Sequence, residues 1–227
     1  MLGIPQTQVI IAALDEEPGI GPTISELKEH LPNTNILVVD GNSRDETANI
    51  AKNEGAEVIY QDGKGKGNAI AKAIKNINSN VDFVIFTDAD HTYPAEHVPR
   101  MLEILEQNPD VGMVLGSRFE GTPDKMAWKG MFHFGNKLLA FAHNQLNGVT
   151  LSDPLTGLRV VRAEIMRGWH VESKGFDFEV ELNHQVERRG LKIIEIPIKY
   201  RQRLGEKKLG MKHGFTILKR IMLETTN

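Results

Sequence analysis

The chain has 227 residues and a net charge of −3, and its 40% hydrophobic and 25% charged residues are typical of a soluble globular protein with a sizeable core. It contains no cysteine, which excludes disulfide bonds and thiolate metal sites. The first residues lack the basic segment of a secretory signal, and no apolar stretch approaches the roughly 18 residues of a membrane span, so we expect a cytoplasmic protein.

Strands and helices are predicted to alternate over the first half of the chain. The predicted strands span residues 8–14, 35–40, 56–60, 83–88 and 111–117, and the predicted helices span residues 23–30, 44–54, 68–77 and 94–107. The second of these helices is expected to open with a capping box at residues 43–46. This alternation is typical of βαβ units, so we predict an α/β fold with a mostly parallel, Rossmann-like sheet and helices on both faces.

The predicted strand at residues 83–88 ends in two aspartates that are one residue apart. Because residues i and i+2 of an extended chain share a face, Asp88 and Asp90 project in the same direction. Two close carboxylates repel unless a cation lies between them, so the pair predicts a divalent ion, Mg²⁺ or Mn²⁺, that holds nucleotide phosphates. A strand that simply runs into an aspartate-rich turn is the alternative.

Other polar groups also follow the ends of predicted strands. They are Asp15 and Glu16, Asp40, the glycine and lysine loop at residues 63–67, and Arg118. Ligands of open parallel sheets bind beyond the carboxyl ends of the strands. The sequence therefore predicts one binding edge that collects these residues.

Beyond residue 121 the alternation weakens. We predict a helix rich in aromatic residues at 126–147, a strand at 158–162, a helix at 176–189, a strand at 192–200, a basic loop at 201–210 and an amphipathic helix at 213–223. Aromatic spacing in the first of these helices favours core packing over lipid contact. We expect residues 1–227 to form a single domain, with a nucleotide-binding half (1–120) and an acceptor-binding half (121–227) that ends in the amphipathic helix.

Positive charge is concentrated near the C-terminus. Residues 188–220 carry eleven Lys or Arg and two acids, a net charge of +9, which leaves −12 for the rest of the chain. This asymmetry favours an anionic partner, such as a phosphate group or a membrane surface, and a merely solvated charged face is the alternative. The amphipathic helix either packs against the sheet or lies on an anionic bilayer, and the sequence leaves both open.

Eight segments, in order along nearly the whole chain, resemble the motifs of family 2 glycosyltransferases of the GT-A fold, and in particular those of the dolichyl-phosphate hexose synthases. They are VIIAALDE (9–16), VVDGNSRDET (38–47), KGKGNA (64–69), TDADHTYP (87–94), GSR (116–118), SDPLTG (152–157), GFDFEVEL (175–182) and RQRLGEKKL (201–209). The resemblance implies an inverting, metal-dependent glycosyltransferase. It implies transfer of a hexose from UDP-glucose, UDP-N-acetylglucosamine or GDP-mannose to a polyprenyl or dolichyl phosphate.

The resemblance also implies roles for individual residues. Those expected to bind the nucleotide or its diphosphate are Ala12, Leu14, Glu16, Asp40, Lys66, Asp88, Ala89, Lys207 and Lys208. The expected metal ligands are Asp88, Asp90 and Thr92, and the expected catalytic residues are Asp90, Arg118, Lys129 and Arg203. Arg118 and Lys129 would hold the acceptor phosphate, whereas Arg203 would close over the diphosphate with Lys207 or Lys208. Thr92 stands where mannose synthases often have glutamine, and Lys129 stands where they have arginine.

The acceptor can also be argued from chemistry. A divalent ion and cationic side chains stabilise the charge that builds on the leaving diphosphate. A phosphate acceptor is already ionised, whereas an alcohol needs a general base, for which Asp153, Asp177 and Glu179 are candidates. Cations outnumber acids in the late segments, which favours the phosphate.

The sequence leaves other functions and partners open. The alternatives are a glycosyltransferase acting on a sugar hydroxyl, a nucleotidyltransferase and a nucleotide-binding module. Three features resemble the archaeal branch of the family, which implies UDP-glucose or UDP-N-acetylglucosamine as the donor. They are Gly41, where many relatives have a second aspartate, the loop at residues 63–67, and the segment at residues 90–93. We expect no nucleic-acid partner, and peripheral contact with the cytoplasmic face of a membrane is a hypothesis.

Overall fold

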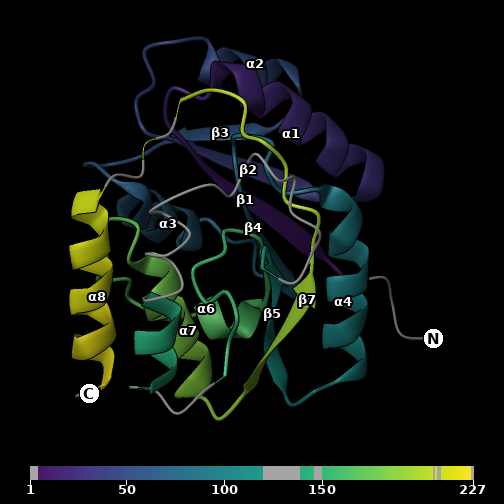
Figure 1. Ribbon diagram of the computed structural model, residues 1–227. Helices are drawn as coiled ribbons and strands as arrows, with labels where there is room; N and C mark the ends of the chain where they lie inside the picture. Colours follow the sequence, from purple (N-terminus) through teal and green to yellow (C-terminus); the bar gives the residue numbers. More distant parts are fainter. Residues whose placement is uncertain (1–4, 120–138, 146–149, 207, 209–210, 226–227) are drawn as a thin grey trace.

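The structure is a computed structural model, which describes residues 5–119, 139–145, 150–206, 208 and 211–225. Within these residues, seven strands form one sheet in the order β3-β2-β1-β4-β6-β5-β7 (Figure 1). The strands are β1 (Thr7–Ala13), β2 (Asn35–Asp40), β3 (Glu57–Tyr60), β4 (Phe83–Asp88), β5 (Val111–Ser117), β6 (Arg159–Arg162) and β7 (Lys192–Pro197). The helices are α1 (Glu17–His30), α2 (Thr47–Asn53), α3 (Lys66–Ile74), the 3₁₀ turn η1 (Ala95–His97), α4 (Val98–Gln107), α6 (Ala163–Met166), α7 (Phe178–Glu187) and α8 (Met211–Thr225).

Six of the seven strands run in the same direction, which confirms the predicted mostly parallel α/β sheet. The exception is β6, which lies between β4 and β5 and is antiparallel to both. The chain leaves β5 at the carboxyl edge of the sheet and re-enters the sheet from that edge, so β6 must run the opposite way. In the register of the sheet, Ala12 lies beside Asp88 and Ala13 lies beside Asp40, which brings the ends of three strands together.

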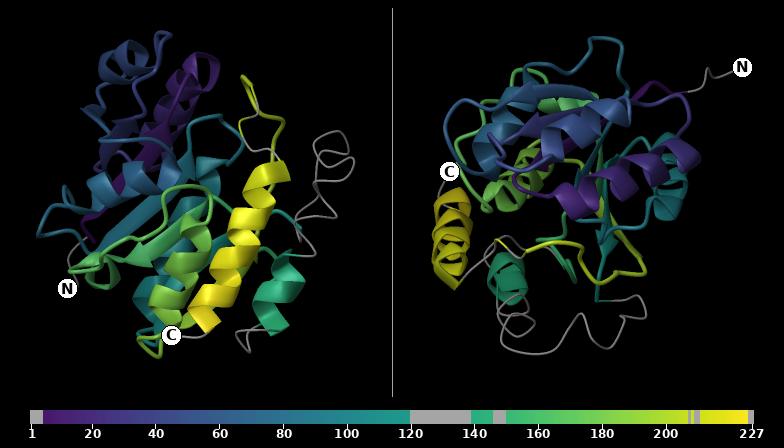
Figure 2. Two further views of the ribbon diagram at one scale, coloured as in Figure 1. Left: turned by 90° about the vertical axis from the view of Figure 1, so that its left-hand side faces the viewer. Right: turned by 90° about the horizontal axis from the view of Figure 1, so that it is seen from above.

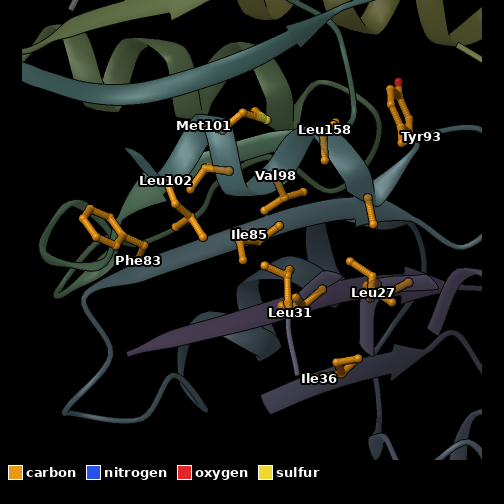
Figure 3. Close-up of a cluster of buried hydrophobic side chains, with 14 of the residues drawn as sticks. Leu27, Leu31, Ile36, Phe83, Ile85, Tyr93, Val98, Met101, Leu102 and Leu158 are labelled. Atoms are coloured by element: carbon orange, nitrogen blue, oxygen red, sulfur yellow. The ribbon is translucent and has the colours of Figure 1, made fainter. Parts of the chain in front are cut away.

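Helices cover both faces of the sheet, as predicted (Figures 1 and 2). Alternate residues of the central strand β1 point to opposite faces: Val9 and Ile11 join the core under α1, α2 and α4, whereas Ile10 joins the core under α3, α6 and α7. Figure 3 shows the first core, in which Met101 and Leu102 of α4 lie over Phe83 and Ile85 of β4. Burial on both faces explains why the central strands are continuous apolar runs.

Several element boundaries differ from the sequence prediction, and β7, for example, ends at Pro197 and not at residue 200. Helix α1 begins at Glu17, six residues earlier than expected, and it contains Pro22. The predicted capping box at residues 43–46 is wrong, since α2 begins at Thr47 without a side-chain cap and the Ser43 hydroxyl donates to Asp40 instead.

No described helix combines the length and the apolar character that crossing a bilayer requires.

Two glycines of α1 allow the helix to approach neighbouring segments. A Cβ atom at Gly19 would lie 2.6 Å from the Ala89 carbonyl oxygen and 2.7 Å from Asp90 Cα, whereas one at Gly21 would lie 3.2 Å from a methyl group of Ile50. The first neighbour is backbone of the segment that carries the two aspartates, and the second is a side chain that can move. Helix α1 therefore packs directly against that segment because residue 19 has no side chain.

We predict that Gly19→Ala lowers the free energy of unfolding by about 1–3 kcal/mol, the usual cost of overpacking. Gly21→Ala is the matched control in the same helix, and it should be neutral or slightly stabilising because alanine favours helix. Urea denaturation of both variants measures the difference. Equal stability of the two variants would contradict the close packing of α1 on residues 89–90.

Candidate active site

The site lies at the carboxyl edge of the sheet, where Asp88 ends β4 and Asp90 follows it. The amide and the hydroxyl of Thr92 both donate to Asp90 Oδ1, at 3.2 and 2.6 Å. Thr92 is fully buried, and its two hydrogen bonds orient Asp90. The residue between Asp90 and Thr92, His91, has a left-handed backbone with φ 61°, which bends the chain sharply after the aspartates.

Lys66 connects the glycine and lysine loop to the aspartates. Its Nζ lies 2.7 Å from Asp88 Oδ1 and 2.7 Å from Glu179 Oε1. The loop reaches this position because Gly65 and Gly67 allow close approach to the backbone of Ser173 and Lys174, where a Cβ would overlap the carbonyl oxygens. The site thus holds an ammonium group between two carboxylates.

The two aspartates differ in their affinity for a proton. Burial on its own would raise the pKa of Asp88, but the charges of Lys66, Arg118 and Arg203 lower it below its ordinary value. Burial and the neighbouring Asp88 charge raise the pKa of Asp90, in spite of the hydrogen bonds from Thr92. Asp90 is therefore the carboxyl group that most needs an additional cation.

The basic segment near the C-terminus closes over these acids. Arg203 lies with one guanidinium nitrogen 2.5 Å from Glu16 Oε1 and 3.3 Å from Asp90 Oδ2. Lys208 Nζ is 2.8 Å from the same Glu16 oxygen and 2.7 Å from the Asp15 carbonyl oxygen. Two cations predicted to contact the donor diphosphate are thus paired with a carboxylate at the end of β1.

The residues predicted to hold the nucleoside surround the ends of β1 and β2. Leu14 is 41% exposed and offers an apolar surface, and Ala12 is half-buried beside it. Asp40 is fully buried, and its two carboxylate oxygens accept hydrogen bonds from the amide and the hydroxyl of Ser43. Ala89 is also buried, so its side chain offers little surface to a ligand. In this arrangement Asp40 shapes the loop after β2.

Arg118 lies at the end of β5, on the other side of Asp88. Its Nε and one terminal nitrogen donate to the two carboxylate oxygens of Asp153, both at 2.7 Å, and its guanidinium lies 5.6 Å from the centre of the Tyr200 ring. Glu195 of β7 accepts hydrogen bonds from the amides of Ser152 (2.5 Å) and Asp153 (2.7 Å). The structure therefore brings Arg118 to the predicted edge, already paired with an acid.

Several residues near the site were not found from the sequence. Tyr93 accepts a hydrogen bond from the Gly157 amide at 2.7 Å, and Thr47 accepts one from the Glu16 amide at 2.8 Å. Glu195 could have been found from the sequence, because it is an acid in the middle of the apolar strand β7. Lys129 and Lys207, which were predicted to bind phosphates, lie outside the described residues.

The described residues at this edge offer few ligands for a divalent ion. Among the described residues, no group of three or more His, Asp or Glu side chains is arranged to hold a metal. Mg²⁺ commonly takes only one or two protein carboxylates and completes its coordination with substrate phosphates and water. Asp88 and Asp90 supply that number of hard oxygen ligands, so the donor set fits an ion that arrives with a diphosphate.

The mostly parallel sheet with helices on both faces, and the edge that carries both acids and cations, correspond to the GT-A architecture. Residues 8–169 match the family model of glycosyl transferase family 2. The chain belongs to this family, which confirms the resemblance of its motifs.

Curated relatives from Haloferax volcanii include a low-salt glycan biosynthesis hexosyltransferase, 35% identical over 90% of this chain and 50% of the relative. The chain thus spans about half the length of this relative. A dolichyl-phosphate hexose transferase of the same organism is 33% identical over 88% of this chain and 85% of the relative. An undecaprenyl-phosphate mannosyltransferase from Micrococcus luteus is 29% identical over 88% of this chain and 86% of the relative.

A solved structure with the same fold is glucosyl-3-phosphoglycerate synthase from Mycobacterium tuberculosis in complex with UDP. It superposes with a TM-score of 0.77 at 19% identity and covers 98% of this chain and 80% of that one. Another structure of that enzyme contains Mn²⁺, UDP-glucose and phosphoglyceric acid. At this identity the likeness establishes the GT-A fold, as predicted.

We predict that Lys66→Met lowers the free energy of unfolding by about 1–3 kcal/mol at pH 7, because it leaves the half-buried Asp88 and the buried Glu179 without their cation. Burial disfavours the charged form of Lys66, yet the two carboxylates raise its pKa, so its contribution persists until the solution pH exceeds the ordinary lysine value. The pKa of Asp88 is lowered, so the contribution is lost as the pH falls through that lowered value.

The difference between the wild type and Lys66→Met should therefore be larger at pH 7 than at pH 3. Urea denaturation at both values measures it. Lys64→Met, which changes an exposed lysine of the same loop, serves as the control and should match the wild type at both pH values. A loss of stability that does not depend on pH would contradict the role of the ion pairs.

Proposed function

We propose that this glycosyltransferase moves a hexose from a nucleotide sugar to a polyprenyl phosphate, with inversion and with the help of a divalent cation. The observation that carries the proposal is the meeting of Asp88 and Asp90 with Lys66, Arg203 and Arg118 at one edge of the sheet. Acids that suit a metal and cations that suit a diphosphate and a phosphate thus converge. The names of the relatives that act on dolichyl and undecaprenyl phosphate support the acceptor.

In this proposal Asp88 and Asp90 hold the cation, Mg²⁺ or Mn²⁺, and Thr92 keeps Asp90 in orientation. When bound, the cation would neutralise charge that develops on the leaving diphosphate. Arg203 and Lys208 would exchange their contacts with Glu16 for contacts with the diphosphate, because both are charge-assisted donors within reach of that space. We propose that Lys129 contacts the acceptor phosphate and that Lys207 contacts the diphosphate.

The charge partners of three acids favour a phosphate over an alcohol as the acceptor. The three candidate bases, Asp153, Asp177 and Glu179, each contact a cation: Arg118 at 2.7 Å, Arg220 at 3.3 Å and Lys66 at 2.7 Å, respectively. Removal of an alcohol proton would have to compete with these ion pairs for the carboxylates. An acceptor phosphate needs no such base and requires only positioning beside the anomeric carbon.

We propose a UDP-sugar, UDP-glucose or UDP-N-acetylglucosamine, as the donor in preference to GDP-mannose. Residue 41 is glycine in this chain, and a Cβ there would lie 3.2 Å from the Ala13 carbonyl oxygen and 3.2 Å from Leu14 Cβ. The site therefore has no side chain at this position and presents the apolar surface of Leu14 to the base. A second acid at this position would offer an acceptor for a base with more donors, such as guanine.

The C-terminal helix supports peripheral contact with a membrane. Ile217 and Ile221 of α8 are buried against Val180 of α7, so one side of the helix belongs to the core. The other side exposes Phe215 (79%), Met222 (50%) and Leu218 (36%). The neighbouring residues 139–145 are helical and expose Phe141 (61%), and Figure 2 shows this segment beside α8.

Both interpretations left open for α8 are thus supported, by different residues. The buried isoleucines account for packing. Phe215, Leu218 and Met222 are three and four positions apart and so share one exposed face of α8, which favours an apolar partner. We propose that this surface rests on an anionic bilayer, which would bring the active site close to a lipid-linked acceptor. Residues 126–138 of the predicted aromatic helix lie outside the described residues.

We predict that the protein releases nucleoside diphosphate when it is incubated with Mn²⁺, dolichyl phosphate and a UDP-hexose, and that it releases less with GDP-mannose. Asp90→Asn should lower the rate by a factor of about 100 or more, the usual loss on removing a group that stabilises charge in the transition state. Asp110→Asn changes an exposed aspartate and should leave the rate unchanged.

Three further measurements distinguish the alternative functions. The first uses dolichol in place of dolichyl phosphate. Release with dolichol and not with its phosphate would favour a hydroxyl acceptor. Release of pyrophosphate from a nucleoside triphosphate would favour a nucleotidyltransferase. Tight binding of nucleotide without release would favour a binding module.

We further predict that the protein sediments with liposomes that contain anionic lipid at low salt. Phe215→Ser should weaken the binding about tenfold, since burial of a phenylalanine side chain contributes about 1.5–3 kcal/mol. Tyr60→Ser, at an exposed position on the edge strand β3, should bind like the wild type. If the wild type does not sediment with the liposomes at low salt, where electrostatic attraction is strongest, the proposed contact with an anionic membrane is wrong.

A further inference from the structure

Three charged or ionisable side chains meet beside the site without belonging to the chemistry described above. Glu26 of α1 accepts two hydrogen bonds from Arg201, from NH2 to Oε1 at 2.7 Å and from NH1 to Oε2 at 2.6 Å. His91 Nε2 lies 3.0 Å from Glu26 Oε2 and 3.1 Å from the Arg201 guanidinium. The three residues, which we call the Glu26 clamp, come from distant parts of the sequence.

The clamp joins the two segments that the proposed reaction needs. His91 directly follows Asp90, and Arg201 lies two residues before Arg203. Glu26 also accepts a hydrogen bond from the Ala95 amide at 3.2 Å, which ties α1 to the end of the aspartate segment. The carboxylate thus makes polar contacts with three separate groups and is mostly buried, with 14% of its side chain exposed.

Backbone hydrogen bonds continue the connection. The Arg201 amide donates to the Thr92 carbonyl oxygen and the Leu204 amide donates to the Asp90 carbonyl oxygen, both at 3.0 Å. Arg203 lies between these two anchored residues, and its guanidinium reaches Glu16 and Asp90. The direction of the Arg203 side chain therefore depends on how the backbone of residues 201–204 is held against residues 90–92.

His91 adds a second constraint. Its left-handed backbone, φ 61°, is uncommon for a residue with a side chain and has to be maintained by the surroundings. The contact of its ring with Glu26 is placed to do this. The bidentate pair with Arg201 fixes the other segment, because a planar guanidinium and a carboxylate have a defined mutual orientation.

We propose that Glu26 is a positioning residue: by holding His91 and Arg201 it keeps Arg203 directed at the donor diphosphate. This role rests on the proposed function as far as the diphosphate is concerned, whereas the anchoring of residues 201–204 does not depend on it. Glu26 lies outside every motif segment of the sequence and touches no reacting atom. Its effect passes through Arg203.

The first test uses trypsin, because residues 201–208 contain several arginine and lysine residues. Cleavage of a folded protein follows the fraction of time that the segment is open. Glu26→Gln should accelerate cleavage after Arg203 about tenfold, as expected for the loss of a hydrogen bond to a charged group, measured by mass spectrometry of the native protein. Glu29→Gln, an exposed glutamate of the same helix, is the matched control and should be cleaved like the wild type.

The second test is kinetic. With dolichyl phosphate and a UDP-hexose, Glu26→Gln should lower kcat about tenfold and leave the KM for dolichyl phosphate unchanged, because the acceptor side of the site is intact. A merely structural role would lower the amount of active enzyme and leave the trypsin pattern of the folded fraction as in the wild type. Arg201→Lys keeps the charge but not the bidentate geometry, and it should show an intermediate effect on both readouts.

Each outcome decides the proposal. Faster cleavage in Glu26→Gln and Arg201→Lys, but not in Glu29→Gln, supports the clamp, even if the wild type transfers no sugar, in which case the proposed function fails alone. Wild-type cleavage and wild-type kcat in Glu26→Gln overturn the clamp while the proposed function stands. If Glu26→Gln does not fold, Arg201→Lys decides on the same two readouts.

Discussion

Repulsion between the carboxylates of Asp88 and Asp90 is the constraint on which the rest of the site depends. The segment places both acids at the end of one buried strand, and the protein balances them with Lys66 on one side and Arg203 on the other. The balance is uneven, since the pKa of Asp88 is lowered and that of Asp90 is raised. A site of this kind is ready to accept one more cation, and the anionic ligand that comes with it can take over the contacts of Arg203 and Lys208.

On the opposite side of this edge, buried charged groups hold the turn at residues 152–157. Arg159 of β6 is fully buried and donates to the carbonyl oxygens of Pro154 and Thr156, while Glu195 of β7 accepts from the amides of Ser152 and Asp153. The turn is therefore held from both sides by charged groups whose hydrogen bonds offset the cost of their burial. It presents Asp153 to Arg118, and it leaves no space for a side chain at Gly157, where a Cβ would lie 2.7 Å from Asp88 Oδ2.

The positive charge near the C-terminus has a more local use than its net value indicates. Arg188 and Arg220 pair with Glu224, Arg201 pairs with Glu26, and Arg203 and Lys208 pair with Glu16. Much of the charge of residues 188–220 is thus matched by acids of the protein itself. Among the described residues of this segment, Arg203 and Lys208 share one carboxylate, Glu16, which an incoming anion could replace.

Local patterns in the sequence were sufficient for the elements and for the binding edge. Apolar periodicity lies within a single segment of the sequence, so the alternation of strands and helices could be predicted. The family was recognised from the resemblance of its motifs. The early start of α1, by contrast, depends on contact between Gly19 and residues 89–90, and the loop after β2 depends on Ser43 pairing with Asp40. These are contacts between segments that no local pattern reports.

The sequence by itself therefore determined the class of fold, the family and the kinds of side chain at the active edge. Only the tertiary structure decided which acid meets which cation: that Lys66 bridges Asp88 and Glu179, that Asp153 occupies Arg118, and that Glu26 joins His91 to Arg201. The antiparallel course of β6 belongs to the same group. The physical reason is that charge pairing and strand direction are set by distances in space between residues up to 192 positions apart, and such distances follow from the packing of the whole chain.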